Sequence, residues 1–163
     1  QKLKEGAKTL NYLAEHGIDS YEALDGRLAE LNAAVDDSIA SIKTVEGRIA
    51  ELNLIAKYAA TYRKCRPVYN RYRKSEDKEK FLRGHESEII LFEAAARELK
   101  RLGAVPLPAA EKLEGELSEL TVQKGTLYAQ YTASKRQVKE YDTIKRNLDI
   151  LLPPEQSVTQ ELE

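Results

Sequence analysis

The sequence has little bulky apolar material. Among its 163 residues there are two Phe and no Trp, and 33% are charged against 42% that are hydrophobic. Such a chain cannot fill a deep globular core, but it suits long helices that each bury one narrow stripe. Gly and Pro are also few, with eight and five residues, which favours uninterrupted helices. We therefore predict an all-α protein.

Residues that carry chemistry are scarce. The only cysteine is Cys65, which excludes an internal disulfide and a cysteine-based metal site and fits a reducing cytoplasm. The two histidines, His16 and His85, lie far apart in sequence and have no carboxylates at ligand spacing, which favours structural roles. The glycines are isolated and form no phosphate-binding loop. We expect no catalytic residue, no metal and no cofactor in this chain.

Long apolar runs are missing as well. No stretch approaches the roughly 18 apolar residues of a membrane span, and no apolar signal peptide opens the chain. We therefore expect no membrane partner and a cytoplasmic location. The chain begins with Gln1 and contains no Met, so we expect it to be a fragment of a larger protein.

The sequence does contain apolar residues at alternating spacings of four and three, which is the heptad pattern of coiled coils. The first series is Leu24, Leu28, Leu31, Val35, Ser38, Ile42, Val45, Ile49, Leu52, Ala56 and Ala59. The second series is Leu113, Leu117, Leu120, Lys124, Leu127, Tyr131, Ser134, Val138, Tyr141, Lys145, Leu148 and Leu152. They predict long helices over about 20–66 and 109–151.

We predict that these helices form the arms of one long antiparallel coiled coil within residues 1–152, a single domain, with a cluster of short helices at the tip (67–108). Pairing within one chain avoids the concentration cost of the alternative, a coiled coil between two chains. The sequence leaves the oligomeric state open. Residues 153–163 are polar and follow two prolines, so we expect a disordered tail.

Shorter elements have local start and stop signals. A helix over 3–16 is predicted to bury Leu3, Ala7, Leu10, Leu13 and Ala14. Gly17 ends that helix, and Asp19 with Glu22 resembles a capping box for the first long helix.

The predicted tip, 67–108, also contains residues that indicate where its helices begin and end. Pro67 predicts a break or a kink. Ser75 is a candidate N-cap for a helix over 76–84. A further helix over 86–102, with a broad apolar face, is followed by Gly103.

Positive charge is concentrated in residues 57–83. This segment holds ten basic residues against three acidic ones, a local net charge of +7, whereas the whole chain has −1. The candidate DNA-binding residues combine basic and tyrosine side chains, which can neutralise phosphates and stack on unpaired bases. They are Arg63, Lys64, Arg66, Tyr69, Arg71, Tyr72, Arg73, Lys74, Lys78, Lys80 and Arg83.

A purely structural interpretation of the same residues is at least as well supported by the sequence. Tyr58, Tyr62 and Tyr69 fall near helical spacing, so they can form a core between helices. The arginines can pair with nearby acidic residues as an ordinary solvated surface.

Four segments carry a resemblance to a known family. They are LNYLAEHGIDSYEAL (10–24), YRKCRPVYNRYRKSEDKEKFLRGHESEIILFEAAARELKRLG (62–103), LPAAEKLEGELSEL (107–120) and YDTIKRNLDILL (141–152). They resemble the C-terminal helical region of relaxases, the mobilization nucleases of conjugative and mobilizable elements in Firmicutes-type bacteria. The most specific part runs from Arg66 to His85.

The resemblance implies a parent protein that nicks DNA through a catalytic tyrosine and a metal-binding histidine cluster in an N-terminal domain. Neither motif occurs in this chain, so no catalytic residue is transferred. What the resemblance implies here is a non-catalytic accessory domain that contributes to DNA binding or to relaxosome assembly, with relaxosome or coupling proteins as partners. The alternative is a protein-interaction or dimerisation module without DNA contact.

Overall fold

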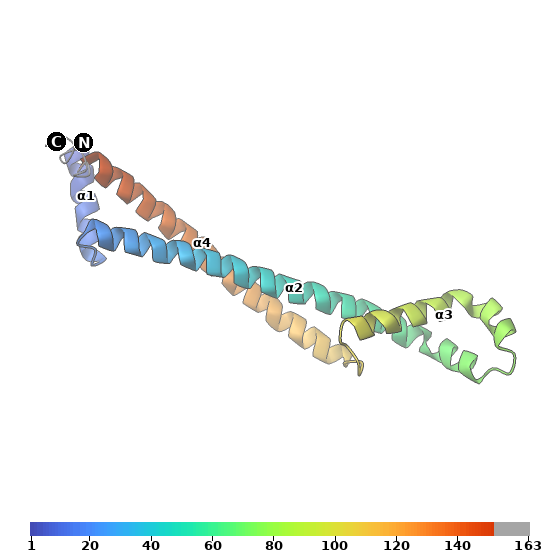
Figure 1. The fold of residues 1–163 in the computed structure, drawn as a ribbon. Helices are drawn as coiled ribbons and strands as arrows, with labels where there is room; N and C mark the ends of the chain where they lie inside the picture. Colours follow the sequence, from blue (N-terminus) through green and yellow to red (C-terminus); the bar gives the residue numbers. More distant parts are fainter. Residues whose placement is uncertain (152–163) are drawn as a thin grey trace, which may run out of the picture. The chain divides into compact units, whose positions relative to one another are not determined.

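The computed structural model describes residues 1–151, apart from the side chains of Lys2 and Leu151, and these residues form four α-helices and no β-strand (Figure 1). The helices are α1 (Lys2–Glu15), α2 (Tyr21–Lys74), α3 (Lys78–Arg101) and α4 (Ala110–Leu151). The all-α prediction is confirmed. The predicted disordered tail, 153–163, lies outside the described residues. None of the described helices is long and apolar enough to span a membrane.

The chain divides into two compact units. The first unit contains Gln1–Ile42 together with the described part of Thr126–Glu163, and the second contains Lys43–Gly125. Both long helices contribute to both units, so each unit contains a part of α2 and a part of α4.

In the first unit, α1 and the start of α2 pack on the end of α4. The buried cluster consists of Leu13, Leu24, Leu31, Tyr141 and Leu148. The Tyr21 hydroxyl donates to Asp149 Oδ1 at 3.1 Å, and Lys145 Nζ lies 2.6 Å from Asp25 Oδ1. Later residues of α2 thus meet earlier residues of α4, so the two segments are antiparallel here.

The first turn of α2 is capped by a residue that the sequence did not indicate. Ser20 Oγ accepts a hydrogen bond from the Ala23 N–H at 3.1 Å. The predicted capping box of Asp19 and Glu22 was therefore wrong by one position. A serine hydroxyl satisfies a free amide of the first turn as well as an aspartate does.

The predicted buried face of α1 was wrong in most of its members. Leu3 and Leu10 are 90% and 57% exposed, whereas Thr9 and Leu13 are buried. Thr9 can be buried because its hydroxyl donates to the Glu5 carbonyl at 2.9 Å, so no polar group is left without a partner.

In the second unit, α3 returns alongside the last part of α2, and the start of α4 closes the core (Figure 1). The buried cluster consists of Leu52, Ile55, Ala59, Leu99, Ala104 and Leu113. The segment between α3 and α4 contains a cis peptide bond at Val105–Pro106.

Helix α2 continues through Pro67 as far as Lys74 instead of ending near 66. The predicted boundary between arm and tip at 66/67 is therefore not a helix end. Proline removes one backbone hydrogen bond, but the helix is held on both sides of it. Tyr62 and Tyr69 both stack on Phe92 of α3, and their ring centroids lie 4.5 and 4.2 Å from the Phe92 ring centroid.

Helix α3 begins at Lys78 because Asp77, not Ser75, is its N-cap. Asp77 Oδ1 accepts from the Lys80 N–H at 3.1 Å. The predicted separation of this region into two helices appears as a kink at His85, which has φ −137° and ψ 25° inside α3. After the helix, Gly103 adopts φ 70°, the left-handed conformation expected of a glycine at a helix end.

The burial pattern of the long helices follows the predicted heptads. All members of both series among residues 1–151 are buried or half-buried. The polar members Ser38, Ser134, Lys124 and Lys145 are half-buried. Each lysine forms an ion pair with a carboxylate. Lys124 lies 3.4 Å from Glu46, and Lys145 lies 2.6 Å from Asp25.

Candidate nucleic-acid interface

The basic residues predicted as a DNA-binding site all lie at the end of α2 and the start of α3, in the second unit. Every one of their side chains is exposed. We call them the basic surface, and they are Arg63, Lys64, Arg66, Arg71, Arg73, Lys74, Lys78, Lys80 and Arg83.

Helical periodicity spreads the six α2 members of the basic surface around the helix. Residues seven apart lie almost above one another on a helix, which aligns Lys64 with Arg71 and Arg66 with Arg73. Lys64 and Arg71 lie opposite Tyr62 and Tyr69, the residues that α2 turns toward α3. Arg66 and Arg73 each follow one of these tyrosines by four residues and therefore lie on the same side of the helix as the tyrosines.

The two tyrosines of the predicted site do not share this exposure. Tyr69 and Tyr72 are half-buried. Tyr69 stacks on Phe92. The centroid of the Tyr72 ring lies 6.1 Å from that of Tyr69 and 6.3 Å from that of Phe81. The structure thus separates the predicted residues into exposed cations and tyrosines that pack between α2 and α3.

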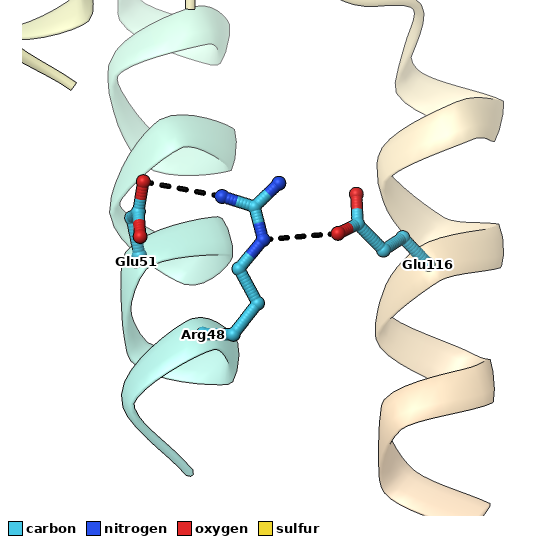
Figure 2. A network of polar contacts seen from close by, with 3 residues as sticks. All are labelled: Arg48, Glu51 and Glu116. Atoms are coloured by element: carbon cyan, nitrogen blue, oxygen red, sulfur yellow. Dashed lines mark hydrogen bonds and ion pairs between the residues drawn. The ribbon is translucent and has the colours of Figure 1, made fainter. Parts of the chain in front are cut away.

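Ion pairs distinguish the basic surface from the other cations. Within residues 1–151, none of its nine side chains forms an ion pair with a carboxylate. Elsewhere, Arg48 bridges Glu51 at 3.1 Å and Glu116 at 2.9 Å (Figure 2). The pKa of Arg48 is raised, chiefly by the hydrogen bond that it donates to Glu116. Cations in ion pairs also include Arg27, Arg101, Lys124 and Lys145.

Three members of the basic surface contact neutral groups. Arg63 Nη2 donates to the Pro108 carbonyl at 2.6 Å and ties α2 to the segment before α4. The guanidinium groups of Arg66 and Arg71 each lie 5.9 Å from a ring centroid, that of Tyr62 and that of Phe81. These contacts orient the side chains without neutralising their charge.

The three acidic residues of 57–83 leave this segment with a net charge of +7. One of them, Asp77, caps α3 and accepts from the Lys80 backbone N–H. Arg71, Arg73 and Lys74 lie in the last turn of α2, where the partial negative charge of the helix end stabilises cations.

Sequence reasoning missed the role of Phe92. It was assigned to the apolar face of its helix, and nothing linked it to the tyrosines of α2. Phe92 is 6% exposed and contacts both Tyr62 and Tyr69. The available signal was the spacing of seven residues between the two tyrosines, which places both on one helix face.

The described residues offer little for other chemistry near the basic surface. A pocket of about 290 Å³ at the α2–α3 turn is lined by Ser75, Asp77, Lys80, Phe81, Gly84 and His85. His85 packs on Phe81 with ring centroids 4.3 Å apart. No group of three or more His, Cys, Asp or Glu residues in 1–151 is arranged to hold a metal ion.

No family model matches this chain, and no curated protein or solved structure shows significant similarity to it.

Proposed function

We propose that this chain is a DNA-contacting accessory module that binds the phosphate backbone through its basic surface. The observation that carries the proposal is the set of nine exposed cations, none of which has a carboxylate partner among residues 1–151. Clustered cations repel one another, and a polyanion relieves that repulsion while it releases its own counterions.

The contrast within the chain supports a dedicated surface. The chain has almost equal numbers of basic and acidic residues, 26 and 27, and ion pairs occur in both units. Partners for cations are therefore plentiful in composition. Arg71, Arg73 and Lys74 nevertheless form no ion pair with a carboxylate among residues 1–151, as expected for a surface that meets an external anion.

The resemblance to relaxases gives this surface a biological context. We propose that the chain is a non-catalytic, cytoplasmic accessory region of a conjugative relaxase and that the nicking chemistry lies in a part of the parent protein outside it. In that setting the basic surface contributes DNA contacts during mobilization of a plasmid or transposon. The most specific segment of the resemblance, Arg66 to His85, includes most of the basic surface.

The proposed architecture is one intrachain antiparallel coiled coil of α2 and α4, which serves as a stalk. The burial of the heptad positions and the antiparallel ion pairs, such as Lys145 with Asp25, support it. Two polar heptad positions, Lys124 and Lys145, reach carboxylates on the other long helix. Such pairs fix register in coiled coils.

A second candidate function is a protein-interaction module that docks relaxosome or coupling proteins. The observation that favours it is a pair of exposed apolar residues on α3, Ile90 and Leu91, which are 53% and 52% exposed. Adjacent exposed apolar side chains are common in interfaces. Capture of a relaxosome protein that is lost in I90S/L91S but kept after charge reversal of the basic surface would favour this candidate.

The primary proposal is tested by DNA binding as a function of salt concentration. We expect fluorescence anisotropy to detect binding near 50 mM salt and the logarithm of the association constant to fall linearly with the logarithm of the salt concentration. Contact with about four phosphates corresponds to a slope of about −3.6 on duplex DNA. Absence of binding at this low salt concentration would overturn the proposal.

A further inference from the structure

We infer that the basic surface binds double-stranded DNA in preference to single strands. This inference rests on the proposed function and concerns the form of the nucleic acid. Proteins that bind single strands combine cations with aromatic rings that have a free face for base stacking. Contact with a duplex backbone requires only cations and other polar donors placed at phosphates.

The innermost rings beside the basic surface are already stacked on one another. Phe92 is buried and contacts Tyr62 and Tyr69 with ring centroids 4.5 and 4.2 Å apart and interplanar angles of 29° and 22°. Tyr62 and Tyr69 are two turns apart on α2, about 10 Å along the helix. They must therefore cover opposite faces of Phe92, and each uses one of its own faces to do so.

The outer rings are also in contact with their neighbours. Phe81 stacks on His85 at 4.3 Å with an interplanar angle of 14°, and the Arg71 guanidinium lies 5.9 Å from the same ring. Tyr72 lies between Tyr69 and Phe81, with ring centroids 6.1 and 6.3 Å away and planes tilted by 47° and 33°. These rings connect α2 to α3, and a base that stacked on the face of Phe81 covered by His85 would have to displace that partner.

The cations surround this cluster of rings. All nine side chains of the basic surface are exposed. No exposed aromatic ring stands among them, because Tyr69, Tyr72 and Phe81 are half-buried. The exposed charge is therefore not accompanied by an exposed ring on which a base of a single strand could stack.

The experiment compares the binding of the whole chain to two probes with equal numbers of phosphates, a mixed-sequence duplex and oligothymidine, at about 50 mM salt. We expect the duplex to bind at least about tenfold more tightly. Tyr72→Leu removes the ring that lies between Tyr69 and Phe81. We expect it to change the affinity for oligothymidine less than about twofold, whereas loss of a stacked base typically costs fivefold or more.

The outcomes separate the inference from the proposed function. A marked duplex preference with a neutral Tyr72→Leu supports the inference. Equal or tighter binding of oligothymidine overturns the inference but leaves DNA binding in place. Binding of neither probe overturns the proposed function itself. Because the comparison of probes uses the wild-type chain, it does not depend on how well the variant folds.

Discussion

Tyr69 of α2 stacks on Phe92 of α3 with ring centroids 4.2 Å apart and planes 22° from parallel. This contact places a tyrosine from the middle of the most basic segment inside a helix–helix packing surface. The same segment therefore has two separate roles along its length. Its aromatic residues join α2 to α3, and its lysines and arginines remain exposed around them.

The first prediction concerns this packing. Phe92→Ala is expected to lower the free energy of unfolding of the second unit by about 3–5 kcal/mol, because it removes a buried ring and leaves a cavity. Tyr69→Phe is the matched control and should change it by less than about 0.5 kcal/mol, since the ring is kept. Amide hydrogen exchange across α3 measures both effects. Equal protection in Phe92→Ala and wild type would contradict the stacked arrangement.

The helical content and the buried stripes of the long helices could be predicted from the sequence because heptad spacing is a direct consequence of helix geometry. Leu24, Leu52 and Leu148 are buried as that spacing requires. Pro67 was harder to interpret, because a proline's effect depends on whether packing on both sides holds the helix. The required partner, Phe92, is distant in sequence.

The candidate site was predictable only in part, for a similar reason. Local composition reveals the concentration of cations from Arg63 to Arg83, and the structure leaves all of them exposed. Whether Tyr69 and Tyr72 were free for base stacking depended on a tertiary contact with α3. On α1, a short helix, Thr9 is buried in place of Leu10, which shows that apolar spacing alone does not determine the face that packs.

A pair of glycine substitutions tests the local conformations of the second unit. Gly103→Ala should destabilise it by roughly 1–2 kcal/mol, because Gly103 has φ 70° and an L side chain is strained there. Gly115→Ala, inside α4, should stabilise it by about 0.5–1 kcal/mol. A Cβ atom would meet nothing within 4 Å at either position. Denaturant unfolding of both variants checks the opposite signs, and equal signs would contradict the backbone assignment.

The ion pair between Arg48 and Glu116 joins α2 to α4 in the second unit (Figure 2). The two side chains are 41% and 38% exposed, so solvent weakens their attraction. A double-mutant cycle with Arg48→Ala and Glu116→Ala should give a coupling free energy of about 0.5 kcal/mol that falls with added salt. A coupling of zero at low salt would show that the pair does not stabilise the second unit.

The first unit should become less stable at alkaline pH. The pKa of Tyr12 is raised, chiefly by burial and also by Tyr141 and Glu140, and the pKa of Tyr21 is raised by burial and by its hydrogen bond to Asp149. A folded pKa above the unfolded value gives a contribution to stability that is complete below about pH 10 and is lost as the pH rises further.

This pH dependence has a matched control. In the double variant Y12F/Y21F, the loss of thermal stability above about pH 10 should be smaller than in wild type, because neither phenol remains to ionise. Circular dichroism melting curves at a series of pH values measure the difference. An unchanged alkaline loss would show that other groups cause it.

The most direct test of the account compares two charge reversals that change the net charge equally. R71E/R73E/K74E alters the basic surface, and R136E/K139E/R146E alters exposed cations of α4 in the first unit. In duplex-binding titrations near 50 mM salt, we expect the first variant to lose about 100-fold in affinity and the second less than about threefold. Equal losses in the two variants, or no loss in the first, would contradict the assignment of DNA binding to the basic surface.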